Sequence, residues 1–197
     1  MTFRGCLLCL AVTSIISSCK NESETTNTST PAPSTIMPLR IGNQWTHRFT
    51  YYDSLGNVTS STNITTSIVS DTVIENERWF FWNDSVFTNR QDGLWYLRGG
   101  LLAKYPANRN DTYRYGTDTL HSPMVRVLSV DSLIVVPMGT FSCYVYEWTE
   151  TTLHYVSTVS FYCPNKGLIR KDQIFPAVFG HNSYLRTRIE LVGMTTQ

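Results

Sequence analysis

The side chains that could do chemistry are scattered along the chain rather than grouped in motifs. The four histidines have no HExxH or CxxC context and stand far apart, at His47, His121, His154 and His181. Neither a G-x-S-x-G elbow nor a G-x-x-x-x-G-K-[ST] loop occurs. Carboxylates are common at expected turns, where aspartate usually hydrogen-bonds its own backbone, at Asp53, Asp71, Asp84, Asp92, Asp111, Asp118 and Asp131. We therefore predict no catalytic residue and no metal site.

Length and charge exclude some classes of protein. A chain of 197 residues, 42% of them hydrophobic, contains enough apolar surface for the core of one domain. Lys and Arg number 16 against 15 Asp and Glu, so the chain lacks the basic surface that nucleic-acid binding needs, and we expect no nucleic-acid partner. No apolar run reaches the roughly 18 residues of a membrane-spanning helix.

The N-terminus has the layout of a secretory signal. Arg4 supplies the one charge before residue 20, an apolar run covers residues 6–16, and small residues then lead to Cys19. Such a run is too short to span a bilayer and is typical of a signal peptide. An ordinary signal, in which the cysteine falls by chance, is one interpretation of this segment.

Residues 16–19, with the sequence Ile-Ser-Ser-Cys, resemble the lipobox of bacterial lipoproteins. In that family the chain is cut just before the cysteine, whose sulfur carries a diacylglycerol and whose amine is acylated. The resemblance implies that residues 1–18 are a lipoprotein signal peptide and that Cys19 is lipidated, with no other cofactor. It also implies a lipid-bilayer partner, because two or three acyl chains hold a protein firmly. The residue after Cys19 is Lys20 and not an aspartate. In this respect the chain resembles lipoproteins of the Gram-negative outer membrane, on either its periplasmic or its surface side.

Beyond the cysteine we expect a tether and then one β domain. Residues 19–38 are rich in Ser, Thr, Asn and Pro, with Ala32, Ile36 and Met37 as the apolar side chains after the cysteine, and are expected to form a flexible linker. From residue 39 to 197 the apolar period is two, as in the alternation of Trp45, His47 and Phe49. Sustained helical spacing is absent.

We therefore predict an all-β fold, an antiparallel sheet folded as a sandwich or as a half-barrel or barrel. A long loop with at most one short strand is expected over 106–123. Strands are expected over 45–52, 58–69, 79–82, 86–88, 94–97, 124–130, 133–136, 141–149, 154–162, 167–175 and 184–192.

Two cysteines, Cys143 and Cys163, lie in strands expected to form a hairpin. A register that sets Val145 opposite Phe161 also sets the two cysteines opposite each other, close enough for a disulfide. We predict a structural disulfide in an oxidising compartment. Two buried free thiols, or a redox or metal role, are the alternatives.

Three segments resemble recurrent stretches of uncharacterised bacterial lipoproteins. They are the opening Gly-Asn-Gln-Trp at 42–45, the Val-Pro-Met-Gly-Thr-Phe turn at 136–141 and the Tyr-Cys-Pro-Asn-Lys-Gly-Leu element at 162–168. The resemblance implies no activity. Its prolines and glycines, at Pro137, Gly139, Pro164 and Gly167, are expected to shape turns.

Aromatic side chains are the candidates for contact with a ligand or a partner protein. In Trp79, Phe80, Phe81 and Trp82, alternate residues point to opposite faces of a strand, so both faces would be apolar. Such a strand is either covered on both sides or exposes one face to a partner. The candidate ligand or partner face comprises Trp79, Phe80, Phe81, Trp82, Trp95 and Tyr96.

Three functions remain in competition. The first is a noncatalytic envelope lipoprotein that binds or scaffolds an envelope protein or glycan. The second is a carrier that holds an apolar ligand in a curved β-sheet, which resembles the half-barrels of lipoprotein-sorting factors but lacks the helices that cover them. The third is a secreted hydrolase that uses paired carboxylates.

Overall fold

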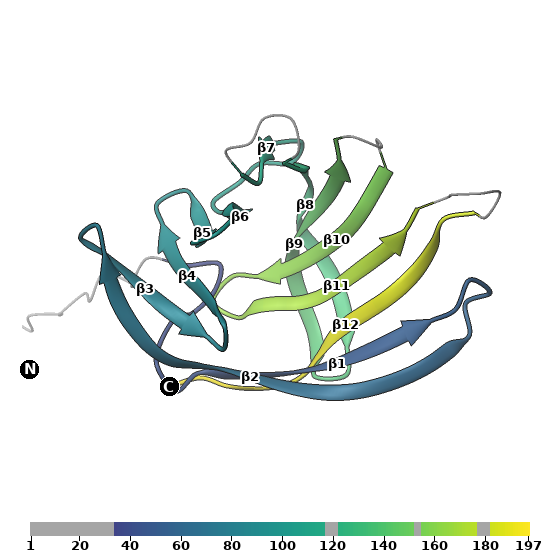
Figure 1. Cartoon of the computed structure of the whole chain (residues 1–197), viewed down its shortest axis with the longest axis horizontal. Helices are drawn as coiled ribbons and strands as arrows, with labels where there is room; N and C mark the ends of the chain where they lie inside the picture. The colour runs from purple at the N-terminus through teal and green to yellow at the C-terminus, as the bar shows by residue number, and fades with distance from the viewer. Residues whose placement is uncertain (1–33, 117–121, 152–154, 177–181) are drawn as a thin grey trace, which may run out of the picture. The chain divides into compact units, whose positions relative to one another are not determined.

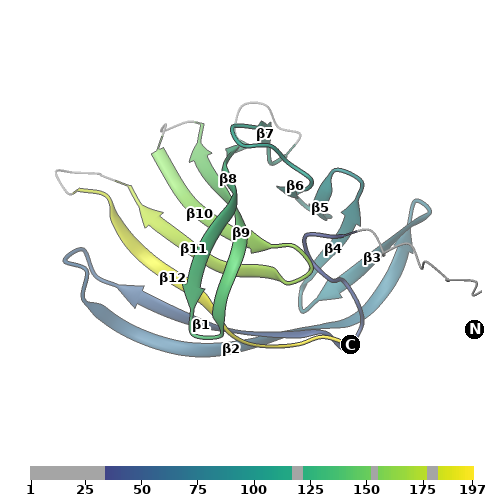
Figure 2. The same ribbon diagram turned by 180° about the vertical axis from the view of Figure 1, so that it is seen from behind.

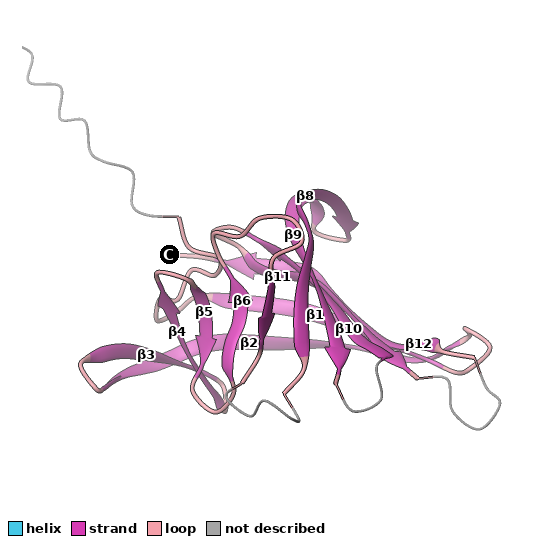
Figure 3. Ribbon diagram, turned by 90° about the horizontal axis from the view of Figure 1, so that it is seen from above, coloured by secondary structure: helices cyan, strands magenta, loops and turns pink. Residues whose placement is uncertain are grey.

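One antiparallel sheet accounts for nearly the whole of the described chain. The computed structural model describes residues 34–116, 122–151, 155–176 and 182–197, and these ranges contain strands and loops but no helix (Figure 3). The first six strands are β1 (Gln44–Tyr52), β2 (Val58–Ile74), β3 (Glu77–Trp82), β4 (Ser85–Arg90), β5 (Gly93–Tyr96) and β6 (Gly100–Lys104). The other six are β7 (Thr112–Arg114), β8 (Met124–Val136), β9 (Gly139–Glu150), β10 (Tyr155–Cys163), β11 (Gly167–Phe175) and β12 (Tyr184–Thr195). The prediction of an all-β antiparallel fold is confirmed.

The sheet is made of two meanders joined by the first and last strands. Its order is β6-β5-β4-β3-β2-β1-β12-β11-β10-β9-β8-β7, and each pair is antiparallel. Figures 1 and 2 show the strands curving round until the two ends of the sheet face each other, so that the sheet is nearly closed and barrel-shaped. Of the two predicted architectures, the barrel-like one is observed, and the sandwich is not.

The period-two pattern explains which side of the sheet is inside. Trp45 and His47 are buried on β1, Phe49 follows them at half-burial, and the residues between point to the outer, convex face. Two departures from the predicted strands are β6, which was not among them, and β8, which runs without a break over the two strands expected at 124–130 and 133–136. Its pairing with β9 shifts register between Val127 and Ser132, so the strand continues through bulges instead of ending.

Tyrosine side chains fill the gap between the two ends of the sheet. The Tyr146 hydroxyl donates to the Lys104 carbonyl at 2.7 Å, and the Tyr113 hydroxyl accepts from the Lys104 backbone N–H at 3.3 Å. Burial raises the pKa of both phenols, so they remain neutral at physiological pH. Side chains therefore join β6 to the β7–β9 end of the sheet where no strand pairing does.

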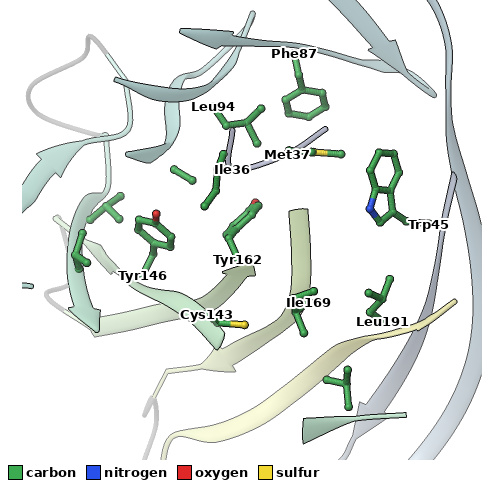
Figure 4. Close-up of a cluster of buried hydrophobic side chains, with 14 of the residues drawn as sticks. Ile36, Met37, Trp45, Phe87, Leu94, Cys143, Tyr146, Tyr162, Ile169 and Leu191 are labelled. Carbon is green, nitrogen blue, oxygen red and sulfur yellow. The ribbon is translucent and has the colours of Figure 1, made fainter. Parts of the chain in front are cut away.

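The core also includes a piece of chain that precedes the first strand. Ile36 and Met37 are 1% and 0% exposed, and Figure 4 shows them among Trp45, Leu94 and Tyr162. We call residues 34–38 the strap, because they cross the inner face of the sheet. The prediction that the flexible linker extends to residue 38 is wrong for the strap, because its two apolar side chains are enclosed by the sheet.

Backbone hydrogen bonds fix the strap to the turn between β10 and β11. The Asn165 and Gly167 N–H groups donate to the Thr35 and Ile36 carbonyls at 2.7 and 3.1 Å. Gly167 has a φ of +89°, and a Cβ atom at this position would lie 3.1 Å from the Met37 Cγ. The predicted turn glycine is therefore required both by its backbone conformation and by the strap.

Candidate functional site

Two pockets lie along the concave face of the sheet. The inner pocket, of about 340 Å³, is lined by His47, Phe49, Thr66, Trp82, Asn83, Asp84, Ser85, Phe87, Leu168, Lys171 and Ile189. The outer pocket, of about 630 Å³, is lined by Tyr51, Glu150, Tyr155, Ser157, Thr158, Gln173, Ile174, Phe175, Pro176, Arg186 and Thr187. Both volumes fall in the range of roughly 300–1,000 Å³ that is usual for small-molecule sites.

Strand register makes the two pockets parts of one surface, which we call the trough. In the inner pocket Ile189 of β12 pairs with Phe49 of β1 and with Lys171 of β11. In the outer pocket Thr187, two residues back along β12, pairs with Tyr51 and Gln173. Residues two apart on a strand share a face, so the trough runs continuously along these three strands.

Aromatic and aliphatic side chains form the wall of the inner pocket. Trp82 and Phe87 lie with their ring centroids 5.4 Å apart, and Trp82 lies 5.5 Å from Trp45 in the core. At the other end the trough is open, and Tyr51 is 38% exposed. Ile64, which pairs with His47 on the same face of the sheet, is 40% exposed. The trough therefore leads from solvent to the aromatic core.

Two titratable bases line the inner pocket. His47 Nε2 lies 3.0 Å from the Leu168 carbonyl, and burial lowers the pKa of the imidazole despite this hydrogen bond. Burial also lowers the pKa of Lys171. His47 is thus held neutral at physiological pH, and Lys171 is the other basic group among the described residues that line this pocket.

The carboxylates needed for hydrolysis do not gather in either pocket. Among the described residues, Asp84 is the one carboxylate lining the inner pocket and Glu150 is the one lining the outer pocket. Within the same ranges, no group of three or more His, Cys, Asp or Glu side chains is arranged to hold a metal ion. Of the four histidines, His121, His154 and His181 lie outside the described residues.

The structure divides the predicted aromatic face between the two sides of the sheet. Phe80, Trp82 and Tyr96 pack against the core on the concave side. Trp79, Phe81 and Trp95 alternate with them in sequence and therefore take the convex side. The structure therefore places three of the six aromatic residues on each face of the sheet.

On the convex side, an arginine covers the two tryptophans. The Arg90 Cζ lies 4.3 Å from the centroid of the Trp95 ring and 5.5 Å from that of Trp79. The same guanidinium forms an ion pair with Glu77 at 2.7 Å, and Trp79 is 4% exposed. The faces of both tryptophan rings are therefore already in cation–π contact with the Arg90 side chain.

The predicted cysteine hairpin has the expected register. Val145 pairs with Phe161 and Tyr144 with Tyr162, as the sequence indicated. Cys143 is buried, Cys163 is half-buried, and both are free thiols in the structure. Burial, together with the neighbouring Cys163, raises the pKa of Cys143 to about 12, so this thiol is unreactive as it stands. The disulfide stays a prediction, and Cys19 lies outside the described residues.

Sequence reasoning missed most of the residues that line the trough. Phe49, Lys171 and Ile189 come from three strands and carry no local motif. The available signal was the alternation along each strand, which gives the face of a residue but not its neighbours on other strands.

No family model, curated protein or solved structure matches the chain. Over the part of the chain that the structure describes, no helix is long and apolar enough to cross a membrane.

Proposed function

We propose that this chain is a lipid-anchored protein of the Gram-negative cell envelope whose noncatalytic β domain binds an elongated amphipathic ligand in the trough. The trough is the observation that carries the proposal. It combines an apolar inner wall with a polar outer mouth, where Thr158, Gln173 and Arg186 lie beside Phe175. Amphipathic molecules likewise combine apolar and polar parts, and both pockets offer apolar side chains with polar groups beside them.

One part of the concave face is covered by other residues and another part is not, and this difference supports the proposal. On one side the strap and the aromatic core occupy the concave face, whereas Phe49, Tyr51 and Ile64 of β1 and β2 have no covering element among the described residues. Exposed apolar surface in a concave site costs free energy unless a ligand covers it. A binding role therefore explains why the sheet extends beyond its core.

The anchor rests on residues 1–19. A diacylglycerol on the Cys19 sulfur and an acyl chain on its amine would hold the domain at the outer membrane through the linker. An envelope protein or glycan would then be a partner of the tethered domain, as the first of the three sequence hypotheses proposes.

Filling the trough tests the binding proposal. We expect the Gln173→Trp variant to lose at least about tenfold in affinity for 1-decanol, because an indole would occupy the centre of the trough, and isothermal titration calorimetry measures this loss. The matched control is Asn63→Trp, since Asn63 pairs with Arg48 on the convex face and should leave binding unchanged. Equal affinities for the two variants, or no saturable binding of 1-decanol or decanoate by the unmodified chain, would contradict the proposal.

Removing the lipidated sulfur tests the anchor. In a Gram-negative host the full-length chain should stay with membranes after a high-salt wash, whereas Cys19→Ser should move to the soluble fraction. Cys9→Ser, which changes a cysteine inside the apolar run, is the matched control and should remain with the membranes. Retention of the Cys19→Ser variant on washed membranes would show that the assignment is wrong.

A further inference from the structure

Lys171 is a basic group on the inner wall of the trough that has no partner among the described residues. It is half-buried, and no described residue forms a hydrogen bond or an ion pair with it. Its neighbour Asp172 pairs with Arg170 and Arg188 instead. Adjacent residues on a strand point to opposite faces of the sheet. The Asp172 side chain therefore lies on the convex face and is not available to pair with Lys171.

The residues paired with Lys171 on the neighbouring strands carry no negative charge, and Glu190 of β12 pairs with Arg48 instead. Its register partners are Ser160 on β10 and Ile189 on β12. Asp84, the carboxylate of the inner pocket, lies at the exposed β3–β4 turn and does not form an ion pair with Lys171. An ammonium group in such apolar surroundings is unfavourable until an anion joins it.

Trp82, which also lines this pocket, has a second donor without a partner among the described residues. Its indole N–H is buried and has no hydrogen-bond acceptor among the described residues. A buried donor without an acceptor usually indicates a missing partner. Lys171 and the Trp82 N–H are thus two donors of the pocket lining that have no acceptor among the described residues, and an acidic ligand would supply one to Lys171.

We propose that the trough selects linear monocarboxylates of the fatty-acid type, with the carboxylate on Lys171 and the alkyl chain along Phe49, Trp82 and Phe87. This inference rests on the proposed function and adds the chemistry of the ligand's head group. The lysine supplies a charge-assisted hydrogen bond, and the aromatic wall covers the chain. The inner pocket, of about 340 Å³, is large enough to hold the head group and part of a chain.

Comparing an acid with its alcohol tests the head-group preference in the unmodified full-length chain. Isothermal titration calorimetry should show decanoate binding about 10- to 100-fold more tightly than 1-decanol, because the alcohol has the same chain but no charge. Acetate should bind at least a hundredfold more weakly than decanoate, because a carboxylate without a chain leaves the aromatic wall uncovered. This comparison needs no variant and so does not depend on how a variant folds.

Substitution then assigns the preference to Lys171. Lys171→Met should lower the affinity for decanoate by about 10- to 100-fold and leave that for 1-decanol unchanged, and Lys171→Arg should restore most of the preference. The matched control is Lys166→Met, a lysine of the β10–β11 turn that lines neither pocket.

The outcomes separate the two proposals. If decanoate and 1-decanol bind equally well and Lys171→Met changes neither affinity, the head-group inference is overturned while the binding role stands. If neither amphiphile binds the unmodified chain, the binding role itself fails. If acetate binds as well as decanoate, Lys171 is a simple anion site and the fatty-acid inference is wrong.

Discussion

Met37→Ala should lower the free energy of unfolding by about 2–5 kcal/mol, the usual cost of truncating a buried methionine. Met37 is 0% exposed and packs between the sheet and the β10–β11 turn. Its own backbone carbonyl accepts hydrogen bonds from the Asn89 amide at 2.8 Å and from the Thr35 hydroxyl at 3.1 Å. The strap cannot move freely to fill the cavity, because these bonds and those to Asn165 and Gly167 hold it.

Guanidinium-induced unfolding, followed by tryptophan fluorescence, measures the loss at Met37. Met138→Ala is the matched control, because Met138 lies at the β8–β9 turn and is 37% exposed. It should change the free energy of unfolding by less than about 0.5 kcal/mol. Equal effects of the two substitutions would mean that the strap does not contribute to the folded core.

Asp172→Asn should lower the free energy of unfolding by about 2–3 kcal/mol, because it removes a charge that two guanidinium groups share. Arg188 Nε donates to Asp172 Oδ1 at 2.9 Å, and Arg170 pairs with the same carboxylate. The Asp172 side chain is 12% exposed and those of the arginines are 22% and 28% exposed, so solvent screens the pairs only in part. The neutral amide would leave these two partly buried cations without the carboxylate that they share, and Glu190 would be the remaining carboxylate near Arg188.

The same carboxylate gives the domain an acid-dependent stability. Burial would raise the pKa of Asp172, but the hydrogen bonds from Arg170 and Arg188 outweigh it and lower the pKa below its usual value of 3.8. Its contribution to stability is therefore fully present above pH 3.8 and is lost as the pH falls through the lowered pKa. Asp172→Asn should remove this part of the pH dependence.

Denaturant unfolding at pH 7 and at pH 3 checks both statements about Asp172. Asp84→Asn serves as the control, because Asp84 is exposed and forms no ion pair among the described residues. It should change the free energy of unfolding by less than about 0.5 kcal/mol at pH 7. An Asp172→Asn variant as stable as this control would mean that the ion pairs of Asp172 with the two arginines do not contribute to the free energy of unfolding.

Local patterns in the sequence were enough to predict most strands and one register. The strand over 167–175 was predicted with the bounds it has as β11, and the pairing of Val145 with Phe161 followed from the position of one hairpin turn. Both depend on residues that are close in sequence. Alternation and turn residues determine such features directly.

The closure of the sheet and the strap could not be predicted in this way. The two meanders form one sheet through the pairing of β1 with β12, which come from opposite ends of the domain's sequence, and the ends of that sheet meet through side chains such as Tyr146. The strap has a polar composition apart from Ile36 and Met37, so its sequence resembles a linker. Its burial depends on a turn 130 residues away, at Asn165. Lys171 was missed for the same reason, since its isolation depends on which strands lie beside it.

The strap also determines how the domain would respond to mechanical force. A tension applied to the chain ahead of Ser34 acts on the hydrogen bond between the Ser34 and Tyr105 hydroxyls and on those that join Thr35 and Ile36 to the β10–β11 turn. It does not peel a strand from an edge of the sheet, because β1 lies between β2 and β12. A pull on this end of the described chain would therefore load the buried core, to which Ile36 and Met37 belong.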